Sequence, residues 1–326
     1  MATTSEAPSP FIGPFARLLT GWVAEQRALG YHYARQVHDL RLLDQWSVTM
    51  GYRDVSLSQS LGESWIAKRP HETEATRQRR VILWRGLAQY MRRQGISAWS
   101  PPPHAATPRY LPHIFTRAEL AALFAAIDAC PIDARSPYRH WVFPVLFRLL
   151  YGTGIRIAEA LALTYHDFDH KTGRIHIRHG KGDKERWIPV HAALVARLEN
   201  YVAKLPSQEP NSPLFPNPRG KAYTTRAIYG AFRRFLWAAG ISHGGRGKGP
   251  RLHDVRHSYV VHCLQGWIRQ GTDLTVALPY LSAYLGHAGL QQTQYYLRLT
   301  AECYPDLIAQ VERACASIIP GGGTIS

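Results

Sequence analysis

Gly152-Thr-Gly-Ile-Arg-Ile-Ala-Glu-Ala-Leu161 is the most informative stretch of this 326-residue chain. Its two glycines permit a tight turn, and the residues after them favour a helix that begins close to another group. Arg156 falls in the first turn of that helix, where a guanidinium and a helix N-terminus together attract an anion. Glu159 follows three residues later on the same face, although a pair at this spacing is more often a surface ion pair.

A turn-rich segment further along the chain predicts a β-hairpin. Residues 174–179 and 186–190 read as short alternating strands, and they flank Gly180-Lys-Gly-Asp-Lys184. Lys181 would then lie near the hairpin tip. Considered alone, it is an exposed turn lysine.

Two more segments carry side chains suited to phosphate. In His253-Asp-Val-Arg-His257, the spacing of three places His253 and Arg256 on one helical face, where both could meet one phosphate. The two histidines lack the glutamate of a zinc-binding helix and an obvious third ligand, so no metal site is expected. Leu285-Gly-His287 is followed nine residues later by Tyr296. A tyrosine near a histidine is ordinarily part of a core.

The order of these motifs resembles the tyrosine recombinase (phage integrase) family. The shared set is Gly-x-Arg-x-x-Glu, Gly-Lys-Gly-x-Lys-x-Arg, His-x-x-Arg-His, Leu-Gly-His and a tyrosine nine residues later. The resemblance spans the second half of the chain. The 31 residues from Arg256 to His287, with Leu-Pro-Tyr-Leu-Ser at 278–282, are similar to the transposon-encoded subgroup.

The resemblance implies a role for each motif residue. Tyr296 would be the nucleophile, with Glu159 orienting the site and Lys181 protonating the leaving 5′-oxygen. The implied catalytic set is Arg156, Lys181, His253, Arg256, His287 and Tyr296. Elementary chemistry agrees, because a phosphodiester is already anionic and its attack requires charge neutralisation. No metal, ATP or other cofactor is needed. Tyr295 remains an alternative nucleophile, and Lys184 an alternative acid.

The expected fold is mainly α-helical with a small antiparallel sheet. Helical periodicity in 11–95 predicts a bundle that resembles the family's core-binding (SAM-like) DNA-binding domain, including a helix opened by a Ser60–Glu63 capping box. Prolines in 96–113 predict a linker. A catalytic domain is expected at 114–317, with a helix over 301–317. Residues 1–10 and 318–326 are expected to be flexible.

The charge balance points to a polyanionic partner. The chain has 39 Lys and Arg against 23 Asp and Glu, and the excess is shared by both parts. Double-stranded DNA recombination sites are therefore the expected partner. We predict DNA contacts by Arg77, Arg80, Arg85, Arg226, Arg233 and Arg251. The resemblance also implies a homotetramer on paired DNA sites, and companion recombinases are an open alternative to action by this chain alone.

Composition restricts the remaining possibilities. The four cysteines form no Cys-x-x-Cys pair, and no apolar run is long enough for a membrane span or a secretory signal. A cytoplasmic, nucleoid-associated protein acting in DNA integration, excision or transposition of a mobile element is expected. Two alternatives remain: a non-catalytic DNA-binding accessory protein derived from a recombinase, and a type IB topoisomerase-like nicking-closing enzyme.

Overall fold

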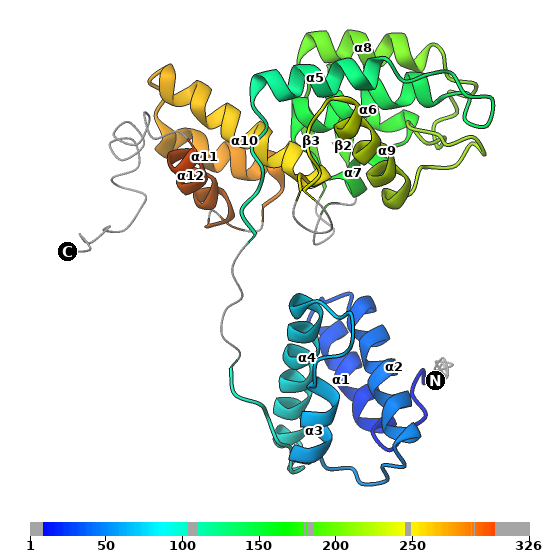
Figure 1. Cartoon of the computed structure of the whole chain (residues 1–326), viewed down its shortest axis with the longest axis vertical. Helices are drawn as coiled ribbons and strands as arrows, with labels where there is room; N and C mark the ends of the chain where they lie inside the picture. The colour runs from blue at the N-terminus through cyan, green and yellow to red at the C-terminus, as the bar shows by residue number, and fades with distance from the viewer. Residues whose placement is uncertain are drawn as a thin grey trace, which may run out of the picture. The chain divides into compact units, whose positions relative to one another are not determined.

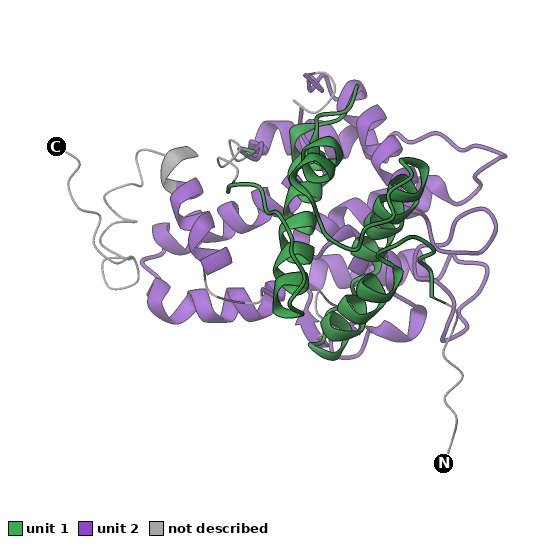
Figure 2. Cartoon of the chain, turned by 90° about the horizontal axis from the view of Figure 1, so that it is seen from below, with its two compact units in different colours: residues 1–110 green, residues 111–326 purple. Residues whose placement is uncertain are grey.

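A computed structural model describes residues 9–103, 110–178, 180, 185–244, 249–287, 289 and 291–303, with the backbone alone for 301–303. The chain forms two compact units, residues 1–110 and residues 111–326, shown in green and purple in Figure 2. The fold is mainly helical with a small antiparallel sheet, as the sequence predicts. No helix in the described ranges is long and apolar enough to cross a membrane.

Over its described residues, the N-terminal unit consists of four helices (Figure 1). These are α1 (Ala16–Ala28), α2 (Ala34–Thr49), α3 (Gln59–Ile66) and α4 (Glu74–Arg93). Their apolar faces enclose a core that includes Phe15, Leu40 and Trp84. The expected capping box is wrong in detail, because Ser58 and not Ser60 caps α3 and accepts a hydrogen bond from the Leu61 N–H at 3.2 Å.

Residues just after α4 belong to the packing of this unit, although the sequence predicts that the linker begins at 96. The Trp99 N–H donates to the Leu57 carbonyl at 2.7 Å, and the Trp84 indole donates to the Trp99 carbonyl at 3.0 Å. Ala98 is buried against the same core. Trp99 therefore packs on α4 and, opposite Gly62, on α3.

The C-terminal unit surrounds an apolar helix with further helices and a small sheet (Figure 1). Its elements are α5 (Arg117–Asp128), α6 (Arg139–Thr153), α7 (Ile157–Ala162), the 3₁₀ turn η1 (Tyr165–Asp167), β1 (Phe168–Asp169), β2 (Arg174–Ile177), β3 (Arg186–Pro189), α8 (Ala192–Val202), α9 (Thr225–Ala238), α10 (Leu252–Arg269), α11 (Leu274–Leu285) and α12 (Gln291–Cys303). α6 packs against α5, α8 and α10. Its buried face therefore organises the main core.

The sheet is antiparallel with strand order β1-β2-β3. Ile175 on β2 pairs with Ile188 on β3, and both are fully buried, so this face of the hairpin is fixed to the core. Strand β1 extends the predicted hairpin by one short strand. A second apolar cluster joins the C-terminal half of α10 to α11 and α12, which lie together in Figure 1. The helix expected over 301–317 lies beyond the described residues, apart from the last turn of α12.

Candidate active site

Arg156 is placed by a turn that only glycine accommodates well. α6 ends at Gly154, which has φ +62°, and a Cβ at this position would lie 2.4 Å from the Tyr259 ring. The chain then turns into α7 with Arg156 as its N-cap residue. Glu159 accepts a hydrogen bond from the Arg156 backbone N–H at 3.0 Å and another from its guanidinium at 2.9 Å. The pair predicted as a possible surface contact is thus a structural element of the site, with Glu159 buried.

Arg256, on α10, is almost fully enclosed at 3% exposure. Its guanidinium donates to the Gly154 carbonyl at 2.5 Å and to the Leu285 carbonyl at 2.9 Å. Arg156 reaches the same end of α11, with contacts of 3.4 Å to the Leu285 carbonyl and 3.3 Å to the Gly286 carbonyl. The carbonyls at a helix C-terminus carry partial negative charge. They hold two cations side by side.

The α11–α12 connection adds His287 to this group. Arg256 Nη2 lies 3.1 Å from His287 Nε2, and His287 Nδ1 lies 2.9 Å from the Thr293 hydroxyl. Since arginine can only donate, Nε2 must accept and Nδ1 carries the proton. Thr293 is fully buried, so it fixes the orientation of the imidazole.

Tyr296 lies against the histidines on the buried side of α12. Its ring stacks parallel to His287 at a centroid distance of 6.0 Å and lies 5.4 Å from His257. Burial raises the pKa of the Tyr296 phenol, while the charge of Arg256 and a hydrogen bond from it act in the opposite direction. Tyr295 is partly exposed and contacts Tyr296 edge-on at 5.7 Å. The arrangement distinguishes the two tyrosines, because Tyr296 is the one that faces the cations.

The two histidines of α10 that belong to the site, His253 and His257, are held in the neutral form. Desolvation by the surrounding protein, with the charges of Arg256 and Arg156, lowers the pKa of His253 to about 4. Although that ring is partly enclosed, its side chain remains accessible to solvent. The pKa of His257 falls to about 3, chiefly through desolvation, and its buried Nδ1 has no hydrogen-bond partner among the described residues. His253 is therefore neutral at pH 7, which is the form that a general base requires.

Sequence reasoning missed Arg186, as it missed Thr293. Arg186, at the start of β3, donates through its guanidinium to both oxygens of Glu159, at 3.2 Å and 2.9 Å. It is the last residue of the Gly-Lys-Gly-x-Lys-x-Arg motif, and that position was the available signal. Lys181 and Lys184 lie outside the described residues, so their side chains are not placed.

The predicted DNA-contact residues of the C-terminal unit are all exposed. Arg226 and Arg233 share the outer face of α9 with Trp237, which is 85% exposed. Arg251 lies immediately before α10, and its N–H donates to Asp254 at 2.8 Å. The structure therefore leaves all three residues exposed to solvent.

The predicted DNA-contact residues of the N-terminal unit are less exposed. Arg80 is buried, and its guanidinium donates to Glu72 and to the carbonyls of Trp65 and Ala67. Arg80 therefore stabilises the fold, and the prediction that it contacts DNA does not fit its burial. Arg77 is half-buried and bonded to Glu74 and the Ile66 carbonyl, and Arg85 is half-buried.

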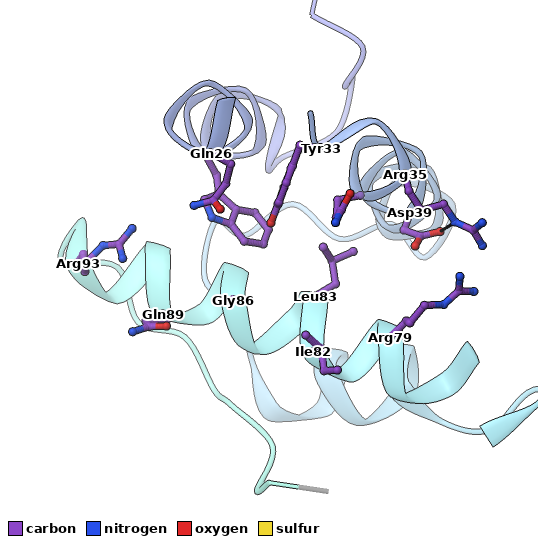
Figure 3. Close-up of a pocket in the computed structure, with 12 residues that line it drawn as sticks. Gln26, Tyr33, Arg35, Asp39, Arg79, Ile82, Leu83, Gly86, Gln89 and Arg93 are labelled. Carbon is purple, nitrogen blue, oxygen red and sulfur yellow. Dashed lines mark ion pairs between the residues drawn. The ribbon is translucent and has the colours of Figure 1, made fainter. Parts of the chain in front are cut away.

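A groove of about 360 Å³ lies on a face of α4 that does not include Arg80 (Figure 3). Residues of α1, α2 and α4 line it. Its lining includes the exposed side chains of Arg79, Ile82 and Gln89 on α4. Arg35 of α2 also lines it and pairs with Asp39 at 3.8 Å. The sequence predicted an arginine-bearing helix here but did not show which of its arginines face outward.

Within the described part of the chain, no group of three or more His, Cys, Asp or Glu side chains is arranged to hold a metal ion. The positive charge near Tyr296 comes from guanidiniums. These can neutralise a phosphate with fixed, forked hydrogen-bond donors.

Comparison with known proteins identifies the family to which the chain is similar. Residues 114–302 match the model of the phage integrase family. The chain is 30% identical over 221 residues to the integrase/recombinase protein y4rB of Sinorhizobium fredii, covering 65% of this chain and 70% of the relative. It is 27% identical over 314 residues to tyrosine recombinase XerD of Vibrio cholerae, covering 91% and 95%. The Tn1549 transposon integrase, solved with a circular intermediate DNA, has a similar fold, with TM-score 0.62 at 16% identity over 89% of this chain and 99% of that chain.

Proposed function

The chain belongs to the phage integrase family, and we propose that it is a site-specific DNA recombinase whose chemistry is carried out by the residues around Tyr296. The observation that carries this proposal is the convergence of Arg156, Arg256 and His287 on one buried tyrosine. A protein that only binds DNA has no use for that tyrosine. The accessory-protein and topoisomerase-like alternatives are not favoured.

Cleavage is proposed as an in-line attack by Tyr296. Its oxygen forms a bond to the scissile phosphorus, and the bond from phosphorus to the 5′-oxygen breaks. His253, neutral at pH 7, takes the phenolic proton, and Lys181 protonates the departing 5′-oxygen. The product is a 3′-phosphotyrosyl link. Attack by the 5′-hydroxyl of another strand reverses these steps, so the bond energy is conserved without ATP.

Arg156 and Arg256 are proposed to neutralise the phosphate. Burial and the neighbouring Arg156 lower the pKa of Arg256 to about 10, which still leaves it charged at pH 7. The contacts of Arg156 with the α11 carbonyls are long, at 3.4 Å and 3.3 Å. A phosphate oxygen would replace them with shorter, charge-assisted hydrogen bonds.

DNA recognition is proposed to involve both units. Net positive charge on each part of the sequence favours a clamp around the duplex. Arg226, Arg233 and Arg251 would contact the duplex from the C-terminal unit, with Arg77 and Arg85 contributing from the other unit. We further propose a homotetramer on two paired sites, because strand exchange needs four cleavages and each chain supplies one nucleophile. The place of action would be the cytoplasm, on nucleoid DNA.

A nicked suicide substrate tests the nucleophile, because loss of the 5′-hydroxyl prevents religation and traps the covalent adduct. Wild-type protein should form the adduct. Tyr296→Phe should bind DNA but form none, and the matched control Tyr295→Phe should retain it. An adduct that persists in Tyr296→Phe and disappears in Tyr295→Phe would move the assignment by one residue. An adduct in both variants would rule out the tyrosine mechanism.

A second substrate tests the general acid. Lys181→Ala should cleave normal DNA slowly and regain speed when sulfur replaces the leaving 5′-oxygen, since a thiolate needs no proton. Lys184→Ala serves as the control on the same turn. Recovery in Lys184→Ala alone would exchange the two assignments.

A further inference from the structure

The Arg186 side chain forms hydrogen bonds to two other elements of the site, in addition to the place of its backbone in β3. Its side chain is 11% exposed and lies under the C-terminal end of α11. Nη1 and Nη2 donate to the two oxygens of Glu159, and Nε donates to the Tyr284 carbonyl at 2.9 Å. The planar guanidinium thus connects β3 to α7 and to α11, a fork that lysine cannot reproduce.

The Glu159 carboxylate is shared between two arginines. Oε1 accepts from the guanidiniums of both Arg156 and Arg186, and Oε2 accepts from the Arg156 backbone and from Arg186. Burial alone would raise the pKa of Glu159, but the hydrogen bonds and charges of the two arginines outweigh burial and hold it below its usual range. The carboxylate therefore remains charged, and its orientation depends on both partners.

Close packing makes this connection rigid. Gly286 has φ +65°, and a Cβ there would lie 2.8 Å from Arg186 Nη1. The backbone that supplies the Gly286 carbonyl to Arg156 therefore rests directly on the Arg186 guanidinium. Removal of Arg186 would free Glu159 to rotate and would leave a gap beneath Gly286. Both changes would displace Arg156.

We propose that Arg186 is a positioning residue that holds the Arg156 guanidinium where it neutralises the scissile phosphate, acting through Glu159 and the end of α11. This role rests on the function proposed above. Arg186 also begins the strand that leads from the segment containing Lys181. The alternative is that Arg186 affects departure of the 5′-oxygen through Lys181, and the experiment must distinguish this effect from positioning of Arg156.

The test compares Arg186→Met with Arg178→Met in the full chain. Arg178 is the matched control, because it directly follows β2, on the same hairpin, and pairs with the buried Asp167 at 2.6 Å. Three nicked substrates are used, with a phosphodiester, a methylphosphonate or a 5′-phosphorothiolate at the scissile position. A methylphosphonate carries no charge on its non-bridging oxygen, so its cleavage needs less neutralisation.

Arg186→Met should bind DNA as the wild type does and cleave the phosphodiester about 10²-fold more slowly, the cost expected of a misplaced catalytic group. Its deficit relative to wild type should shrink about tenfold or more on the methylphosphonate, since a missing charge contact costs roughly 10²–10³ in rate. The phosphorothiolate should leave the deficit unchanged. Arg178→Met should cleave all three substrates like the wild type.

Several results would overturn the proposal. Recovery of Arg186→Met on the phosphorothiolate would mean that Arg186 acts through the leaving group. An equal deficit on all three substrates, or wild-type rates, would exclude positioning of Arg156. If Arg186→Met fails to fold, Arg186→Lys takes its place. The lysine keeps the positive charge but loses the forked donors, so its cleavage deficit should be smaller than that expected for Arg186→Met and should show the same dependence on substrate. Arg156→Met is the reference variant, because the methylphosphonate should restore its cleavage directly. If the methylphosphonate does not restore cleavage by Arg156→Met, or if wild-type protein forms no adduct, the proposed function itself is refuted.

Discussion

Replacement of Gly154 by alanine should destabilise the C-terminal unit and displace Arg256. An alanine at φ +62° incurs the left-handed backbone penalty of roughly 1–2 kcal/mol. Its Cβ would also lie 2.4 Å from one carbon of the Tyr259 ring and 3.3 Å from Leu285. Overpacking of this kind costs about 1–3 kcal/mol. The total expected loss is therefore about 2–5 kcal/mol.

Gly271→Ala provides the matched control. Gly271 has φ +69°, and nothing lies within 4 Å of its virtual Cβ, so only the backbone penalty applies. In calorimetry of the full chain, 1 kcal/mol shifts the melting temperature of a domain this size by about 2–4 °C. Gly154→Ala should therefore lower the melting temperature about twice as much as Gly271→Ala.

Cleavage separates the two variants further. Because the Gly154 carbonyl accepts a hydrogen bond from Arg256, a shift of this turn moves a phosphate-binding group. Well below its melting temperature, Gly154→Ala should form the covalent adduct about 10²-fold more slowly, whereas Gly271→Ala should match the wild type. Equal losses of stability, or wild-type cleavage by Gly154→Ala, would refute the link between this turn and Arg256.

Three further predictions concern conditions of assay. Cleavage should continue in excess EDTA, because guanidiniums supply the positive charge; activity lost on chelation and restored by magnesium would contradict this. If the clamp neutralises about six to ten phosphates, DNA affinity should fall roughly 10³–10⁵-fold between 50 and 200 mM salt, and a flat response would exclude it. The melting temperature of the C-terminal unit should fall as the pH drops from 6.5 towards 4. The pKa values of His253 and His257 are lowered from 6.5 to about 4 and about 3, so the unfolded chain binds protons first. His257→Asn should flatten that decline, and an unchanged slope would count against it.

The motif residues could be predicted because each motif is local. A turn followed by a helix fixes Arg156 relative to Glu159, and helical spacing puts His253 and Arg256 on one face. Their assembly into one site could not be derived from spacing, and only the resemblance to a family predicted it. The backbone carbonyls of α11 that accept hydrogen bonds from both arginines could not be predicted, because a pattern of side chains does not show which backbone groups will lie beside them. Thr293 and Arg186 likewise have roles that depend on long-range contacts.

The arginines of α4 show where periodicity fails. The sequence predicted a cationic helix from about Glu74 to Gln94, because caps, apolar spacing and charge are properties of neighbouring residues, and the structure has it at Glu74–Arg93. The sequence did not determine that Arg80 points inward to Glu72 while Arg79 lines an open groove. Adjacent positions on a helix differ by about 100°, so the choice depends on which face packs against α3. Sequence therefore set the residue types and their local geometry, and tertiary packing decided which charges became structural and which remained exposed.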